Sequence, residues 1–152
     1  MKVNSIVEIR QNSRYKYEMD LDSGILILDR VIKLPYPASY GYIVGSLEED
    51  GDALDLFVCS KEPIVQGALI TVNIVGAFVC KDDGVYDRKV ISYLPDEHSS
   101  SQIEYIDYMK IKEFLTNYKE NFEVIEYVTQ DEAIKIYENS VKVFADDADK
   151  NT

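Results

Sequence analysis

Roughly the first 90 residues form short apolar runs rich in Val, Ile and Tyr, separated by turn residues. Such runs predict β-strands. We place these strands near residues 5–10, 14–20, 25–32, 53–59, 68–77 and 86–93. Asp22-Ser23-Gly24 and Lys81-Asp82-Asp83-Gly84 are expected to form hairpin turns, because Asp and Gly adopt the backbone conformations that tight turns require. Leu34-Pro35-Tyr36-Pro37 should be an ordered loop, since proline cannot donate a hydrogen bond within a strand.

After Pro95 the apolar positions recur every three or four residues, which is typical of amphipathic helices. The two series are Ile111, Phe114, Leu115 and Tyr118, then Ala133, Ile134, Tyr137, Val141 and Phe144. Between them, residues 122–128 predict one more short strand. The expected fold is α+β and mainly β, a compact barrel or strongly curved sheet with two helices packed outside.

Length and composition favour one domain over residues 1–152, since 46% of the 152 residues are apolar, which suffices for one sizeable core. No stretch reaches the roughly 18 to 20 apolar residues of a membrane span, and the start lacks the apolar segment of a signal peptide. We therefore expect a cytoplasmic protein. Cys59 and Cys80 lie in apolar runs and are expected to be buried free thiols.

The formal net charge is −12. This charge argues against binding of nucleic acid or of an anionic membrane, because both attract basic surfaces. An anionic substrate would therefore have to bring its own cations. Residues 146–152 contribute to this acidity and are expected to form a flexible, solvated tail.

Three carboxylates, those of Asp50, Asp52 and Asp55, lie within six residues directly before an apolar run. If these side chains converge, they repel one another unless cations lie between them. Magnesium and manganese take such oxygen ligands, and Gly51 allows the backbone to bend so that the carboxylates can meet. An acidic loop that faces solvent is the alternative interpretation.

A second acidic group, Asp82, Asp83 and Asp87, is followed by Lys89. In a strand that begins near Tyr86, Asp87 and Lys89 point to the same face, which places an acid beside a base. A polar hairpin tip with a weak surface ion pair is the alternative.

Two further groups have charged or hydroxyl-bearing side chains. They are the charged residues Glu8, Lys16, Glu18 and Arg30, and the later set Tyr36, Tyr40, Tyr42, Tyr118 and Lys119. Tyrosine hydroxyls donate to phosphate oxygens, and lysine offers a positive charge. A solvated strand face and core packing are the respective alternatives. The single histidine, His98, is expected to be an exposed loop residue without a catalytic role.

The order of these groups resembles that of the soluble family I inorganic pyrophosphatases. The most specific match is Asp50-Gly51-Asp52-Ala53-Leu54-Asp55-Leu56, which departs from the family signature at Ala53, where proline is usual. Tyr36-Pro37-Ala38-Ser39-Tyr40-Gly41 and Tyr118-Lys119 match two further motifs, and Asp83 stands where glutamate is common. The resemblance implies a five-stranded closed barrel of the oligonucleotide-binding type with two main helices outside. It also implies hydrolysis of pyrophosphate to two phosphates.

The resemblance implies a role for each matching residue. Asp52 would orient the attacking water and accept its proton. The implied metal ligands are Asp50, Asp55, Asp82 and Asp87; the substrate-binding residues are Lys16, Arg30, Tyr40, Lys89, Tyr118 and Lys119; the supporting residues are Glu8, Glu18, Tyr36 and Asp83. The implied cofactor is Mg²⁺, several ions per site, with Mn²⁺ or another divalent metal as a substitute. The implied substrate is the magnesium complex of pyrophosphate, and the implied assembly is a homo-oligomer such as a hexamer.

Two other classes of protein remain open. A catalytically silent relative would use the same barrel to bind phosphate or a partner, but such a chain would have lost acids or cations that are all present here. A metal-dependent phosphohydrolase of nucleotides or polyphosphate would need a surface for base stacking, which the sequence does not reveal.

Overall fold

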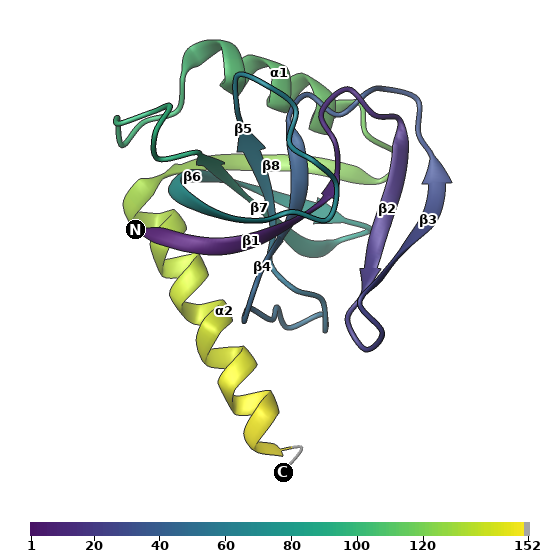
Figure 1. The fold of residues 1–152 in the computed structure, drawn as a ribbon, viewed down its shortest axis with the longest axis vertical. Coiled ribbons are helices and arrows are strands. Elements are labelled where there is room, and N and C mark those ends of the chain that lie inside the picture. Colours follow the sequence, from purple (N-terminus) through teal and green to yellow (C-terminus); the bar gives the residue numbers. More distant parts are fainter. Residues whose placement is uncertain (151–152) are drawn as a thin grey trace.

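The computed structural model describes residues 1–150 of the chain. The strands and helices follow one another as labelled in Figure 1. They are β1 (Lys2–Ile9), β2 (Tyr15–Asp20), β3 (Ile25–Val31), β4 (Ser39–Ile43), β5 (Asp55–Cys59), β6 (Leu69–Asp82), β7 (Val85–Tyr93), α1 (Tyr105–Thr116), β8 (Phe122–Thr129) and α2 (Gln130–Lys150).

Five strands form a hydrogen-bonded ring. Neighbours pair in the order β1-β4-β5-β7-β6, and β6 also pairs with β1, which closes the ring. β8 pairs with β6, while β2 and β3 form a separate hairpin beside the barrel (Figure 1). The prediction of a mainly β fold, close to a closed five-stranded barrel and with two helices outside, is confirmed.

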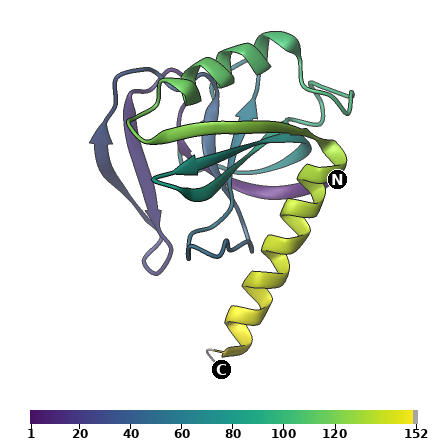
Figure 2. The ribbon, with the colours of Figure 1, turned by 180° about the vertical axis from the view of Figure 1, so that it is seen from behind.

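The two helices lie on the outside of the barrel, with α1 along one end and α2 descending from the end of β8 (Figure 2). α1 buries Ile111, Phe114 and Leu115, the residues that its periodicity selects, and they pack in one cluster with barrel aromatics such as Phe57. α2 buries Ala133 in a second apolar cluster of the barrel. α1 is therefore held by the apolar stripe that the sequence predicts. α2 packs only through the first part of its predicted stripe, because Ile134 and Tyr137 contact the second cluster whereas Val141 and Phe144 are exposed.

β4 (Ser39–Ile43) is not predicted from the sequence, because its residues lack an apolar alternation. Gly41 explains this composition. A Cβ at Gly41 would lie 1.9 Å from the carbonyl oxygen of Ile6 in β1, the strand with which β4 pairs. The two backbones approach too closely at this point for any side chain, so the strand needs glycine here. Glycine has no side chain and therefore weakens the alternation by which a strand is predicted.

The hairpin between β6 and β7 is tighter than predicted. β6 continues to Asp82, so Asp83 and Gly84 alone form the turn, with φ angles of 51° and 83°. Asp-Gly with two positive φ angles suits a two-residue turn whose twist matches that of the strands. Asp82 is thereby a strand residue at the end of the barrel.

Cys59 and Cys80 are buried and free, as predicted. Residues 146–150, predicted as a flexible tail, continue α2 as a helix, and residues 151–152 of that prediction lie outside the described part. Within residues 1–150, no helix is long and apolar enough to cross a membrane.

Substitution Gly41→Ala should destabilise the barrel by about 3 kcal/mol, because the added methyl group collides with the backbone of β1. Chemical unfolding measures the loss. Ser39→Ala on the same strand is the matched control: its buried hydroxyl has no hydrogen-bond partner, so the change should cost about 0.5 kcal/mol or less. Equal losses for the two variants would contradict the close approach at Gly41.

Candidate active site

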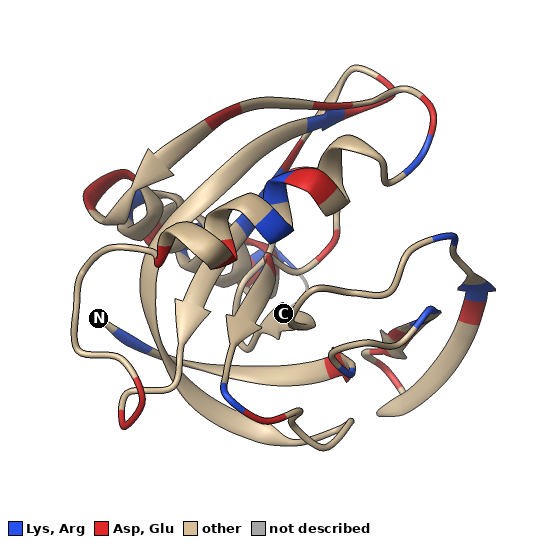
Figure 3. Cartoon of the chain, turned by 90° about the horizontal axis from the view of Figure 1, so that it is seen from above, with Lys and Arg blue, Asp and Glu red and all other residues tan. Residues whose placement is uncertain are grey.

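A polar cleft of about 310 Å³ is lined by residues of the β2–β3 hairpin and of the barrel. A smaller hollow of about 150 Å³ shares five lining residues with it: Asp52, Ala53, Asp55, Asp82 and Asp87. We treat the two as one cleft with a main lobe and, at the smaller hollow, an acidic lobe. Charged residues are spread over the whole chain (Figure 3), and several of both signs converge in this cleft.

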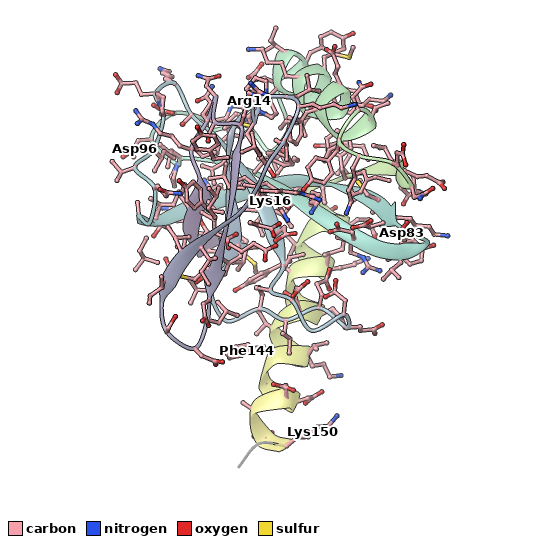
Figure 4. The ribbon with its side chains drawn as sticks, turned by 90° about the vertical axis from the view of Figure 1, so that its right-hand side faces the viewer. Arg14, Lys16, Asp83, Asp96, Phe144 and Lys150 are labelled. Carbon is pink, nitrogen blue, oxygen red and sulfur yellow. The ribbon has the colours of Figure 1, made fainter. Side chains whose placement is uncertain are left out.

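Most of the predicted site residues line this cleft. Those in the main lobe are Glu8, Lys16, Glu18, Tyr40, Asp52, Asp55, Asp82, Asp87, Lys89, Tyr118 and Lys119, and Asp50 lines the acidic lobe. The barrel strands, the hairpin and the segment after α1 all contribute to this set. Figure 4 looks onto the molecule from the side, with Lys16 in front of the barrel and Asp83 at the tip of the β6–β7 hairpin.

Lys89 lies at the centre of the cleft. β5 and β7 are parallel and pair Asp55 with Lys89, so the sheet brings this acid and this base together. The Lys89 Nζ atom is 2.9 Å from Asp55 Oδ2 and 3.1 Å from Asp87 Oδ2, and it also donates to the Tyr40 hydroxyl. Burial alone would lower the pKa of Lys89, but the two carboxylates outweigh burial and raise it. The lysine therefore stays charged.

A tight turn presents Asp50 and Asp52. Its ends are joined by Glu48 N, which donates to Asp52 O at 2.7 Å, and by Gly51 N, which donates to Glu48 O at 3.0 Å. Gly51 has a φ of 92°, a conformation that L side chains disfavour. Burial and the carboxylates of Asp50 and Asp55 raise the pKa of Asp52.

The cleft holds more negative charge than its lysines neutralise. Asp82 pairs with Lys119 at 2.8 Å through Oδ2, while its buried Oδ1 has no hydrogen-bond partner. Burial raises the pKa of Asp87 although Lys89 opposes the shift, and Asp55 and Asp82 add to it. An unpartnered buried carboxylate oxygen and mutual repulsion both favour a bound cation.

The hairpin side of the cleft carries the other cations. Lys16 Nζ lies 3.0 Å from Glu18 Oε1 and 3.3 Å from Asp29 Oδ2. Arg30 lines neither lobe, but its Nη2 donates to the Tyr118 hydroxyl at 3.1 Å, and Tyr118 does line the main lobe. Arg30 thus lies at the edge of the cleft.

Tyr36 and Asp83 are not brought to the cleft. Tyr36 is 1% exposed, and its ring centroid lies 5.2 Å from that of Tyr40 and 4.7 Å from that of Phe114. It packs behind Tyr40, so any support it gives to the site passes through that ring. Asp83 lies in the β6–β7 turn and lines neither lobe.

His98 is not the exposed loop residue that its sequence context predicts. Its side chain is 8% exposed and stacks on Tyr93, with the ring centroids 3.8 Å apart. One ring nitrogen, Nε2, lies 2.8 Å from the carbonyl oxygen of Gln102. A polar loop sequence does not reveal the flat aromatic surface that buries this ring. His98 lines neither lobe of the cleft.

No sequence motif includes Glu48 and Arg88, which line the acidic lobe, or Tyr17 and Met19, which line the main lobe. Glu48 belongs to the acidic run before Asp50, and Arg88 separates Asp87 from Lys89. Their closeness in sequence to the motifs was the only sign that these residues belong to the site. For Arg88 even this sign was weak, because strand alternation predicts that it points to the opposite face from Asp87 and Lys89.

The donor set of the cleft fits a hard divalent cation. The aspartates that line it offer only oxygen ligands, which Mg²⁺ and Mn²⁺ prefer, and the buried Oδ1 of Asp82 is unpartnered. Within residues 1–150, no three acidic, His or Cys side chains already form a ready-made cation site. The fit therefore rests on donor chemistry and on the surplus of negative charge.

Carboxylates beside lysines and tyrosines in one cleft are typical of hydrolases that act on phosphoanhydrides. The family model described as inorganic pyrophosphatase matches residues 5–145. An inorganic pyrophosphatase from Campylobacter jejuni is 32% identical over 93% of this chain and 91% of its own length. The inorganic pyrophosphatase of Nanoarchaeum equitans is 37% identical, over 90% of this chain and 93% of its own. A solved inorganic pyrophosphatase from Helicobacter pylori superposes with a TM-score of 0.88 at 29% identity, over 95% of this chain and 94% of that one.

The chain therefore belongs to the inorganic pyrophosphatase family. It is a hydrolase that cleaves inorganic pyrophosphate, as the sequence resemblance implies.

Glu8→Gln should change the pH dependence of stability. Burial raises the pKa of Glu8 from 4.5 to about 7, although the Met19 N–H, 2.7 Å away, opposes the shift and Asp55 adds to it. The stability contributed by protonated Glu8 is complete below pH 4.5 and is lost as the pH rises through about 7. Glutamine keeps an acceptor for Met19 without the charge.

Unfolding in metal-free buffer tests this prediction. At pH 8 the Glu8→Gln variant should be more stable than the wild type by up to about 3 kcal/mol, and at pH 4 the two should be equal. A difference that does not vary with pH would contradict the raised pKa of Glu8.

Proposed function

We propose that the two-lobed cleft is the site of pyrophosphate hydrolysis and that the substrate enters as its magnesium complex. The observation that supports this proposal is the convergence of Lys89, Asp55 and Asp87 between the acidic lobe and the other lysines. The acidic lobe would attract the cations of the complex, and the basic side chains would bind its phosphate oxygens.

The proposed cation ligands are Asp50, Asp55, Asp82 and Asp87. Asp50, Asp55 and Asp87 are assigned to one cation, Asp55 also to a second, and Asp82 with Asp87 to a cation that arrives with the substrate. Asp55, Asp82 and Asp87 line both lobes, which supports the proposal that more than one cation shares them as ligands. Mg²⁺ is the proposed ion, and Mn²⁺ is a substitute. When bound, such cations neutralise phosphate charge and lower the pKa of the attacking water.

Asp52 is the proposed residue that orients the attacking water and accepts its proton. Asp52 lines both lobes, and burial together with Asp50 and Asp55 raises its pKa. A raised pKa makes a carboxylate a stronger proton acceptor near neutral pH. The backbone N–H of Asp52 donates to Asp50 Oδ1 at 3.0 Å, which holds the turn in shape.

The proposed phosphate contacts come from four strands and from the segment that follows α1. They are Lys16, Arg30, Tyr40, Lys89, Tyr118 and Lys119. In the structure Lys119 is paired with Asp82, so each of these two side chains has to exchange partners when substrate and cations bind. Lys89, buried among acids, is proposed to assist the bridging oxygen or the leaving phosphate.

Asp52→Asn should lower kcat for pyrophosphate by about a hundredfold or more, because it removes the proton acceptor but keeps the shape of the side chain. Phosphate release from pyrophosphate with Mg²⁺ measures this effect, beside ATP and tripolyphosphate as alternative substrates. Asp96→Asn, an exposed residue outside both lobes, is the matched control. Full activity of Asp52→Asn would contradict the role of Asp52.

Mg²⁺ or Mn²⁺ should raise the melting temperature, since cations that bind only the folded state stabilise it by about 2.7 kcal/mol at a hundred times their Kd. Thermal unfolding with and without each metal measures the shift. Asp55→Asn and Asp87→Asn should each reduce it, and Asp149→Asn, at the far end of α2, should leave it unchanged. A shift that all three variants retain would place the bound cations outside the cleft.

We also propose that the chain forms a homo-oligomer in the cytoplasm, with a hexamer as the expected assembly. Large apolar side chains are exposed on β3 and α1, including Ile25, Ile27 and Ile106, and such exposure favours association. The buried free thiols suit a reducing compartment. Light scattering should give a multiple of the 17.4 kDa chain mass, and a monomer mass would contradict the assembly.

A further inference from the structure

An ion pair in the acidic lobe has no part in the chemistry proposed above. Arg88 Nη1 lies 3.6 Å from Glu48 Oε1, and the Glu48 side chain is 14% exposed. Among the described residues that line this lobe, Arg88 is the one basic side chain. It therefore contacts an acid that is not one of the proposed cation ligands.

Glu48 stands at the base of the turn that carries Asp50 and Asp52. Its backbone N–H donates to Asp52 O at 2.7 Å, and its carbonyl accepts from Gly51 N at 3.0 Å. The next residue towards the N-terminus, Leu47, donates its N–H to Ser140 O of α2 at 3.0 Å. The backbone of the turn is thus anchored from α2, and the Glu48 side chain adds a link to the rest of the acidic lobe.

Arg88 supplies this second link from β7. The parallel register pairs Asp55 of β5 with Lys89, so the residues that lead into β5 run beside Arg88. The guanidinium carbon lies 5.3 Å from the centre of the Tyr86 ring, a cation–π contact that restricts the arginine. Glu48 and Arg88 therefore connect the turn with Asp50 and Asp52 to the strand that carries Asp87.

We propose that Glu48 and Arg88 are positioning residues, whose ion pair sets the separation between the carboxylates of the turn and that of Asp87. This inference rests on the proposed function of those acids. Like charges that converge repel one another. The ion pair opposes the outward movement of the turn that this repulsion favours. Small displacements of reacting groups reduce reaction rates strongly. A change in the geometry of the turn should therefore affect kcat more than it affects the affinity for substrate.

A double-mutant cycle tests the proposal with Glu48→Gln, Arg88→Gln and the double variant. Each single change should lower kcat roughly ten- to a hundredfold and leave KM within about twofold, because the contact acts on the reacting geometry. The double variant should be no slower than the slower single variant, since either change removes the same contact. Arg88→Lys, which keeps the charge, should retain most of the activity.

Glu49→Gln is the matched control, because it removes the same charge one residue along from an exposed side chain outside both lobes. Its kcat should equal that of the wild type. The Mg²⁺ concentration for half-maximal activity should rise for the Glu48 and Arg88 variants but not for Glu49→Gln. The free energy of unfolding in EDTA can be measured without metal or substrate. The effects of the Glu48 and Arg88 substitutions on it should again be non-additive.

Additive losses of kcat in the cycle would overturn the proposal. Coupling in the free energy of unfolding with an unchanged kcat would overturn it as well, because that result marks a purely structural contact. The Asp52→Asn variant separates this failure from failure of the role proposed for Asp52. A fully active Asp52→Asn enzyme overturns the role of Asp52 at the site. An inactive one, together with additive losses at Glu48 and Arg88, overturns only the positioning role.

Discussion

The contact of Lys89 with Asp55 and Asp87 is the interaction on which the cleft depends. Lys89 is 6% exposed, and a buried charge is tolerated only when it is paired. The parallel pairing of β5 and β7 supplies the first partner, because it places Asp55 opposite Lys89, and the second lies two residues along the same strand. The β5–β7 pairing that forms part of the barrel therefore also brings these charges together. Loss of this lysine would leave two carboxylates facing each other without a counter-charge.

The same carboxylates are the proposed cation ligands, so Lys89 and divalent cations would compete for them. In the structure the lysine neutralises part of the acidic lobe, but the buried Oδ1 atom of Asp82 has no hydrogen-bond partner and the pKa values of Asp52 and Asp87 are raised. This surplus of negative charge destabilises the folded chain, and in the proposed function it would attract a cationic complex. A preorganised site of this kind trades stability for binding and for transition-state stabilisation.

Periodicity was sufficient to predict the fold class, because the strands and helices of this chain alternate or repeat their apolar residues in the ordinary way. It failed at β4, where the close approach of β1 demands Gly41 and removes the strand signal. The polar sequence around His98 was misleading as well, because its stacking partner Tyr93 belongs to another element, β7. Burial of a side chain depends on such distant partners, which local sequence does not contain.

The candidate site was predictable as far as its motifs extend. Tyr36 and Asp83 match those motifs yet lie outside the cleft, since a motif does not show which side chains face a cavity. Glu48 and Arg88 lie in the cleft without belonging to any motif. Their pairing depends on the register of β5 and β7, which brings the turn before one strand beside the other.

The most direct test of the cation-binding role of the cleft is a crystal structure of the Mn²⁺-soaked protein, with the ions located by anomalous scattering. The expected peaks lie in the cleft, within ligand distance of Asp55 and Asp87 and of Asp50 or Asp82. Peaks confined to the acidic end of α2 and absent from the cleft would contradict it.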